Sequence, residues 1–391
     1  MAGPDYKANQ DKDDFLQLLA VLGVDFLLSG EEKVSPILCA GKMICLFFSA
    51  NWSRPCRTFT PQLVQLYNSL QKRGEKLEII FISLDHDKNE FEQYFKTMPW
   101  LAVPLNDKLQ KQLCGKYHVD CIPSFVPLCG DHILKEDDLI GFLEDYGAEV
   151  FPFTRKRMQE LKAMDCAKRV EGRLEELFGN RGYNYVISSH GGKTQISQLV
   201  GKTIGLYFGA YWSPPSRSFT AKLSKVYKEI MDKTENHHSS LEVIFVSTDR
   251  NLDEFKLNIM DMPWLAIPYE DETRGDLYRI FDVKAIPTLV LIGADGKTSS
   301  ENGRGLVCLY GAEAFPFTAE RIYELERAVK KEGEDLPSKV EDIKHEHVLK
   351  LEFAKAYVCD FCKLQGRFWA FSCHICDYDL HPTCVQLTNN V

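Results

Sequence analysis

The sequence lacks several features that would each define a class of protein. No apolar stretch approaches the roughly 20 residues that a membrane-spanning helix needs. Residues 1–14 are polar and acidic, without the basic and apolar regions of a secretory signal. The chain has no basic tract, and its 391 residues carry a net charge of -9. We therefore expect no membrane span, no nucleic-acid partner, and a location in the cytoplasm or the nucleus.

Cysteine is abundant, with 13 in the chain. In a reducing compartment these thiols are expected to be free, catalytic or metal-bound rather than paired in disulfides. A hydrophobic content of 45% and a charged content of 26% are typical of globular proteins. The length is sufficient for two or three domains.

Most of the chain is one unit that occurs twice. Residues 41–60 match residues 201–220 at an offset of 160, and later segments match at an offset of 164. The later matches are 98–104 with 262–268, 122–123 with 286–287, and 146–149 with 310–313.

Each repeat predicts a strand–helix–strand crossover. Residues 43–48 and 77–84 are almost continuously apolar, as in strands that are buried on both faces of a sheet. Between them, apolar residues recur with the spacing of a helix that packs on that sheet, at Leu63, Leu66, Tyr67 and Leu70. We expect domains at 15–164 and 165–329 after the polar segment 1–14, then a charged linker at 330–344 and a Cys/His-rich module at 345–391.

A motif rich in serine and proline follows the first strand of each repeat. Residues 51–56 read Asn-Trp-Ser-Arg-Pro-Cys, and residues 211–216 read Tyr-Trp-Ser-Pro-Pro-Ser. Both resemble the Trp-Cys-x-x-Cys redox motif of thioredoxin-like proteins, but serine replaces cysteine at Ser53, Ser213 and Ser216. Because oxygen cannot form the mixed disulfide through which exchange proceeds, neither motif can perform the standard reaction.

Cys56 is the sulfur that these motifs retain, and two interpretations apply to it. It is either a surrogate nucleophile or a small buried hydrophobic residue, and the second interpretation is favoured because thiols inside a helix gain less from its terminus. Cys121 is an auxiliary thiol or a passive residue. The prolines retained in the second repeat have two interpretations. They either preserve a groove that binds peptides without chemistry, or they preserve the structure of the turn and nothing more.

The last 47 residues concentrate metal-ligand residues. They comprise two Cys-x-x-Cys pairs and four further ligands, which are enough for two closed tetrahedral zinc sites. A disulfide framework conflicts with a reducing compartment. We expect the nearby aromatic residues Phe361, Trp369 and Phe371 to pack around the metal rather than to contact lipid. The candidate ligands are His345, His347, Cys359, Cys362, Cys373, Cys376, His381 and Cys384.

Residues 47–52, the Met-Pro-Trp-Leu-Ala segment of each repeat and the Cys/His module together resemble a nucleoredoxin of the plant type, in the tryparedoxin-like branch of the thioredoxin superfamily. The resemblance implies an α/β protein with two tandem thioredoxin-like domains, each a mixed sheet flanked by helices, plus a small C-terminal zinc-binding module. It also implies that Pro123 and Pro287 border the motifs, so that they form substrate grooves with Trp52 and Trp212. Phe47 and Tyr207 stand where thioredoxins place a buried carboxylate, so acid–base assistance from that position is absent.

The module resembles the zinc modules related to the phorbol-ester-binding domains of protein kinase C. This resemblance implies interleaved ligands. One site would use Cys359, Cys362, His381 and Cys384, and the other Cys373, Cys376 and an N-terminal histidine. We expect His345 and His347 together to complete the second site.

The sequence thus favours a protein thiol-disulfide oxidoreductase whose substrates are proteins with disulfides or thiols. The alternative is a redox-inactive scaffold or adaptor that recruits protein partners. Neither repeat carries a Gly-rich dinucleotide fingerprint, so electrons from a nicotinamide cofactor would arrive through a partner reductase.

Overall fold

The computed structural model describes residues 24–128, 139–178, 183–233 and 240–388. The polar segment predicted at 1–14 lies outside them. The chain divides into two compact units, residues 1–164 and 165–391, and the division falls within helix α6 (Arg155–Glu171). No helix in the described part is long and apolar enough to cross a membrane.

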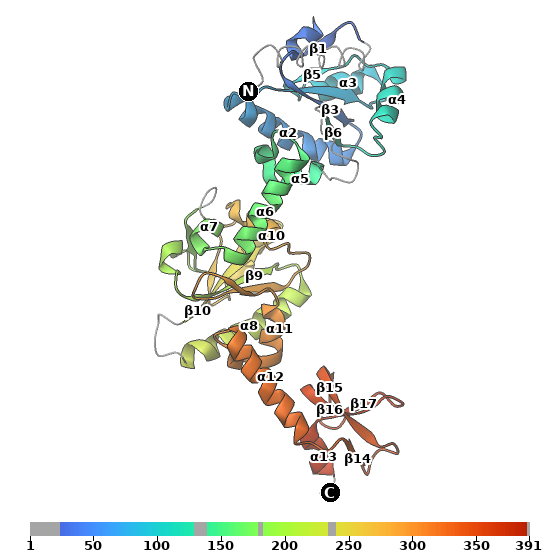
Figure 1. Ribbon diagram of the computed structural model, residues 1–391. Coiled ribbons are helices and arrows are strands. Elements are labelled where there is room, and N and C mark those ends of the chain that lie inside the picture. The colour runs from blue at the N-terminus through green and yellow to red at the C-terminus, as the bar shows by residue number, and fades with distance from the viewer. Residues whose placement is uncertain (1–23, 129–138, 179–182, 234–239, 389–391) are drawn as a thin grey trace, which may run out of the picture. The chain divides into compact units, whose positions relative to one another are not determined.

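The first unit is a mixed sheet with helices on both faces (Figure 1). Its strand order is β2-β1-β5-β4-β3-β6, and β3 runs parallel to β4 with α2 between them, which confirms the predicted crossover. The strands are β1 (Leu27–Ser29), β2 (Glu32–Val34), β3 (Met43–Ser49), β4 (Leu77–Ser83), β5 (Leu101–Ala102) and β6 (Ser124–Pro127). The helices are α2 (Arg54–Lys72), α3 (Lys88–Phe95), α4 (Asp107–Lys116) and α5 (Leu139–Tyr146), with 3-10 turns at Pro36–Cys39 and Gly147–Val150.

Successive residues of β3 face opposite layers of the core. Phe47 packs in the cluster that includes helix α2, whereas Leu46 and Phe48 pack in the cluster that includes helix α4. All three side chains have no exposed surface. A strand that is covered on both faces accounts for the near-continuous apolar run in the sequence.

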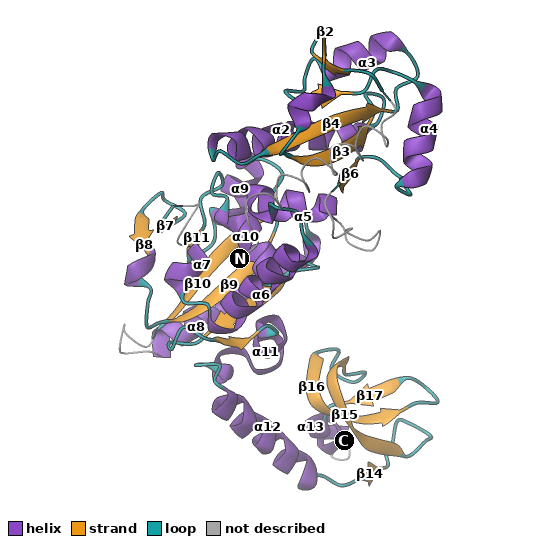
Figure 2. Cartoon of the chain, turned by 45° about the horizontal axis from the view of Figure 1, so that its top comes forward, coloured by secondary structure: helices purple, strands orange, loops and turns teal. Residues whose placement is uncertain are grey.

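The second unit repeats this sheet and adds an edge strand. Its order, β13-β12-β9-β10-β11-β7-β8, corresponds to the first sheet with β13 added among the described residues. Helices lie on both sides of β9 and β10 (Figure 2). The strands are β7 (Tyr185–Ile187), β8 (Lys193–Gln195), β9 (Thr203–Gly209), β10 (Leu241–Ser247), β11 (Leu265–Ala266), β12 (Thr288–Ile292) and β13 (Thr298–Ser300). The helices are α7 (Leu174–Phe178), α8 (Pro214–Lys233), α9 (Leu252–Ile259), α10 (Thr273–Ile280), α11 (Gly303–Tyr310) and α12 (Ala319–Glu334), with 3-10 turns at Ile196–Gln198 and Gly311–Ala314.

The C-terminal module is a small antiparallel sheet followed by a short helix. Its elements are β14 (Lys339–Val340), β15 (Leu349–Val358), β16 (Gln365–Cys373), β17 (Tyr378–Leu380) and α13 (Pro382–Thr388). The sheet order is β14-β15-β16-β17.

The stretch 330–344 is not the plain linker that its charge suggested. Helix α12 continues to Glu334, and β14 pairs with β15 through Val340 and Leu349. The helix continues because its last turns have a partner, since the Trp369 indole donates a hydrogen bond of 2.8 Å to the Val329 carbonyl. Gly333 is buried against the same indole.

We predict that Gly333→Ala destabilises the second unit by about 1–3 kcal/mol, the usual range for overpacking. A Cβ atom at Gly333 would lie 2.1 Å from Cζ2 of Trp369. Gly275→Ala is the matched control, because a Cβ atom in that helix meets nothing within 4 Å. The control should be stabilising by up to about 1 kcal/mol, since alanine is the better helix former. Thermal unfolding measures both, and equal stabilities would contradict the packing of α12 against Trp369.

Candidate functional site

The first motif lies where β3 ends and α2 begins. Ser53 is the N-cap residue of α2 in an extended conformation, and its side chain makes no capping hydrogen bond. Cys56 occupies the third helical position and has no exposed surface, and it belongs to the apolar core cluster beneath the sheet. The structure thus places the motif as predicted and supports the interpretation of Cys56 as a buried residue.

The predicted proline borders the motif. The Ile122–Pro123 peptide bond is cis, and Ser124 pairs with Phe48 across the sheet, so Pro123 reaches the end of β3 from which the motif starts. Cys121 is exposed, and both it and Cys56 are free thiols. The proline and the motif therefore share one edge of the sheet, while the two sulfurs differ in exposure.

Three hydroxyl groups lie behind Cys56, and no motif in the sequence marks them. Tyr94 on α3 approaches Thr60 at 2.5 Å and Ser49 at 3.0 Å, and Thr60 also donates to the Cys56 carbonyl. Burial raises the pKa of the Tyr94 hydroxyl. These residues lie far apart in the sequence, and only the fold brings them together behind the first turn of α2.

The second motif keeps the same turn without sulfur. Ser213 immediately precedes α8, and its hydroxyl accepts a hydrogen bond of 3.4 Å from the Ser216 backbone N–H. The Ser216 hydroxyl is buried and has no partner among the described residues. Tyr207 on β9 donates to the Ser216 carbonyl and lies 2.8 Å from the Thr220 hydroxyl. Burial raises the pKa of Tyr207 to about 12, so it remains a neutral donor at this position.

The second groove is built like the first. Ile286–Pro287 is cis, and Thr288 pairs with Phe208, which brings Pro287 to the end of β9. Trp212 is 42% exposed, so its ring is available at the surface beside the motif. Its indole N–H is fixed by a bond of 3.2 Å to the Thr248 carbonyl.

A buried aspartate holds the loop of the first motif. Asp85 accepts a hydrogen bond of 2.6 Å from the Asn51 backbone N–H and one of 2.7 Å from Ser83. The Trp52 indole donates to the neighbouring Leu84 carbonyl, so its half-exposed ring is fixed beside the motif. Burial is the main reason that the pKa of Asp85 is raised above its ordinary value. The Asp249 carboxylate holds the second loop in the same way.

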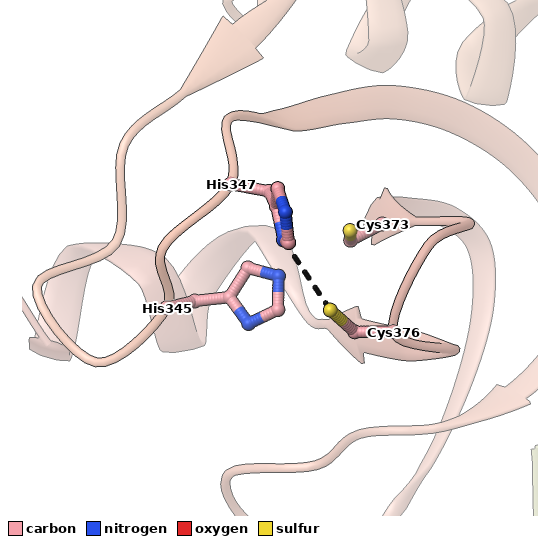
Figure 3. Close-up of side chains that lie close together, drawn as sticks. All are labelled: His345, His347, Cys373 and Cys376. Carbon is pink, nitrogen blue, oxygen red and sulfur yellow. Dashed lines mark hydrogen bonds between the residues drawn. The ribbon is translucent and has the colours of Figure 1, made fainter.

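The candidate metal ligands fall into the two sets expected from the sequence. Within each set the donor atoms lie within 4.8 Å of one another. Figure 3 shows the second set, in which both imidazoles and both sulfurs point toward a common centre. The first set is Cys359, Cys362, His381 and Cys384, and the second is His345, His347, Cys373 and Cys376.

These donors fit zinc. In the first set, Nδ1 of His381 lies 3.3 Å from the sulfur of Cys362 and 3.6 Å from that of Cys384. In the second, Nδ1 of His347 lies 3.3 Å from the sulfur of Cys376. These are the edge lengths, about 3.5 Å, of a tetrahedron with the usual Zn–S and Zn–N bond lengths. Nε2 of His345 is buried without a hydrogen-bond partner in the described part, as expected of an unused ligand atom.

The aromatic residues of this module do not all pack around the metal ligands, contrary to the expectation. Phe371 is buried at 2% exposure in the module core. Trp369 instead bonds to α12, and Phe361 is 40% exposed with the Lys344 ammonium over its ring. The sequence does not distinguish these roles because they depend on which face of each strand meets another element.

Comparisons with known proteins agree with this architecture. A thioredoxin-like family model matches residues 41–132 and 201–298, and a C1 domain model matches residues 343–385. The chain is therefore a tandem thioredoxin-fold protein with a C-terminal C1-type module.

The chain belongs to the nucleoredoxin family. It is 57% identical to the Arabidopsis thaliana protein named probable nucleoredoxin 3, over 96% of this chain and 95% of that protein. It is 47% identical to probable nucleoredoxin 3 of Oryza sativa subsp. japonica, over 88% of this chain and 74% of the relative. Tryparedoxin II of C. fasciculata, a solved structure, is 36% identical and matches with a TM-score of 0.33, over 37% of this chain and 91% of that one.

Family membership makes this protein a thioredoxin-fold oxidoreductase, and it does not favour the redox-inactive scaffold. The C1 domain match and the two Cys/His sets indicate zinc binding. The first motif retains one thiol at Cys56, and the second retains none.

We predict that Asp85→Asn becomes more stable relative to the unchanged protein as pH rises from about 4 to 7. The folded-state pKa of Asp85 is raised by burial. The protonated Asp85 carboxyl group therefore stabilises the fold at low pH, and this contribution is lost as pH rises through the raised pKa. Asparagine stays neutral and keeps an oxygen that can accept from Asn51. Urea unfolding at several pH values measures the difference, and parallel curves would contradict a raised pKa.

Proposed function

We propose that this protein exchanges thiols and disulfides with client proteins through its first domain alone. The observation that carries the proposal is the retained thiol of Cys56, in the first turn of α2 beside cis-Pro123. The first domain combines a sulfur in the first turn of the motif helix with a peptide-binding edge. The second domain has the terminus and the edge but no sulfur at its motif.

The exchange begins from the single motif thiol, and a client disulfide reaches Cys56 only when the first turn of α2 opens, because the Cys56 side chain has no exposed surface in the closed fold. The Cys56 thiolate attacks a client disulfide, forms a mixed disulfide and releases the other client sulfur as a thiolate. A second thiolate then attacks the Cys56 sulfur of the mixed disulfide, forms a disulfide with Cys56 and releases the remaining client sulfur as a thiolate. Cys121 is the auxiliary thiol that we propose for this step, because it is exposed and stands two residues before Pro123.

The remaining sites serve binding and structure. We propose that Trp52 and Pro123, and likewise Trp212 and Pro287, line grooves for client peptides. None of the twelve cysteines in the described part forms a disulfide, which supports a cytoplasmic or nuclear location. Electrons from a nicotinamide cofactor would enter through a partner reductase, because neither repeat carries a dinucleotide fingerprint.

We predict that Ser53→Cys raises the rate of insulin disulfide reduction by at least about tenfold, because a thiol at the N-cap of α2 ionises far more readily than an ordinary cysteine. In the unchanged chain, Cys56→Ser should abolish the activity that remains. Insulin turbidity with dithiothreitol as the reductant, after subtraction of the uncatalysed rate, measures all three proteins.

The matched control is Ser213→Cys, which creates a thiol at the equivalent position of the second domain but leaves Ser216 without sulfur. It should gain much less than Ser53→Cys. An inert Ser53→Cys protein would refute the assignment of the first motif. Residual activity that survives Cys56→Ser would refute the role of Cys56.

We propose that two zinc ions bind per chain, one in each Cys/His set, and that they hold the fold of the module. A module of 47 residues has a small core, and structural zinc contributes roughly 10–16 kcal/mol of apparent binding free energy. Four donors in each set close both sites, so neither leaves a position for substrate.

We predict about two zinc ions per chain by inductively coupled plasma mass spectrometry. Cys376→Ser should lower the content to about one, because it removes a ligand of the second set and leaves the first intact. Chelation should lower the melting temperature of the full chain. A stoichiometry of one in the unchanged protein would contradict the second site.

A further inference from the structure

The surface around the second motif carries exposed arginines that the redox chemistry does not use. The Arg250 guanidinium lies 5.2 Å from the centre of the Trp212 ring, a cation–π contact beside the motif. Arg304, at the start of α11, donates to the carbonyl of cis-Pro287 at 3.5 Å. Both side chains are exposed, so their remaining N–H groups face solvent at the groove.

A third arginine is half-buried beneath this surface. Arg274 at the start of α10 donates to the Ser247 carbonyl at 3.1 Å, and its guanidinium lies 4.4 Å from the centre of the Tyr269 ring. Its Nε–H is buried without a hydrogen-bond partner among the described residues. An unpaired donor on a charged group is costly to bury, and an anionic oxygen would satisfy it.

The carboxylates of Asp271, Asp249 and Glu270 lie near Arg274 and offset its charge in part. Asp249 uses its oxygens on the Tyr211 backbone N–H, the Ser247 hydroxyl and the Asn258 amide. Within the described part, none of the three arginines forms a salt bridge within 4 Å. Asp249 has a counterpart in the first repeat, Asp85, which holds the loop of the first motif. Without a salt-bridge partner among the described residues, the guanidinium groups of Arg250 and Arg304 remain available to a ligand.

The first repeat serves as an internal reference. At the offset of 164 that relates the two copies beyond their motifs, each of the three arginines of the second repeat replaces an uncharged or weakly basic residue. Compared with the first repeat, the second lacks the motif sulfur and has gained these arginines, while Pro214 stands in place of Arg54 and Glu272 in place of Lys108. The first-repeat residues are His86, Gln110 and Ile140.

We propose that the groove of the second domain binds an acidic segment of a partner protein, with Arg250, Arg274 and Arg304 recognising its carboxylates. Guanidinium groups pair with carboxylates through two parallel hydrogen bonds. The three arginines come from three different elements and are held by separate contacts, an arrangement that fits several carboxylates along an extended chain. Exposed Trp212 and the cis-Pro287 edge supply the apolar and backbone surface for that chain. This binding does not rest on the disulfide exchange assigned to the first domain.

The test uses the full chain with its thiols kept reduced, so failure of the exchange chemistry does not affect it. The probe is a fluorescein-labelled peptide of alternating glutamate and glycine, and its reference replaces every glutamate with glutamine. Fluorescence anisotropy should show binding of the acidic peptide that weakens as salt is raised. The double variant Arg250→Gln/Arg304→Gln should weaken this binding about tenfold or more, since it removes two charge-assisted contacts.

The control variant Lys225→Gln/Arg327→Gln removes two exposed charges from the same unit, away from the groove, and should leave the affinity unchanged. Circular dichroism checks that both variants remain folded. Equal binding of the acidic and neutral peptides, or equal losses in both double variants, would overturn the proposal. Binding of a phosphoserine peptide alone, without the glutamate peptide, would overturn the assignment to carboxylates.

Discussion

The structure depends on one constraint. The strand before each motif is buried on both faces, and the motif helix begins just after that strand ends at the edge of the sheet. In the first domain, β3 lies between two apolar clusters, so its backbone direction is fixed before the motif begins. The chain then turns at Ser53 into α2, with Asp85 and the Trp52 indole holding the turn. This geometry presents the motif to a substrate whether or not the motif contains sulfur, which explains how the scaffold persists while its reacting atoms have changed.

The two repeats pack different residues behind the first turn of the motif helix. Each places a tyrosine hydroxyl behind the first turn of the motif helix, next to a threonine one turn further along. In the first domain this tyrosine is Tyr94 on α3, and in the second it is Tyr207 on the central strand β9. Both repeats therefore contain the contact between a tyrosine hydroxyl and a threonine hydroxyl, although the tyrosine comes from a different element in each. Tyrosines from different elements can take this place because a close-packed interior requires only that the space is filled and that the buried polar group has a hydrogen-bond partner.

The divergence at the surface is of another kind. The first domain keeps a thiol at its motif, whereas the second domain keeps the groove, lacks the thiol and places Arg250 and Arg304 beside the groove. A duplicated fold can distribute binding and chemistry over two copies because the edge of the sheet supports either. The C1-type module adds a third surface, attached through the contact of Trp369 with α12.

The sequence by itself determined the duplication, the crossover of each repeat and, with the family resemblance, the pairing of the Cys/His ligands. These features depend on local periodicity and short spacings, which can be recognised directly in the sequence. The tertiary structure alone decided that Cys56 lies inside the core, that Tyr94 meets Thr60, and that Arg304 reaches the cis-Pro287 carbonyl. It also decided that the charged stretch after Val329 continues as a helix and enters a sheet. Each of these outcomes depends on contacts between residues far apart in the chain, where long-range packing, rather than local propensity, selects the conformation.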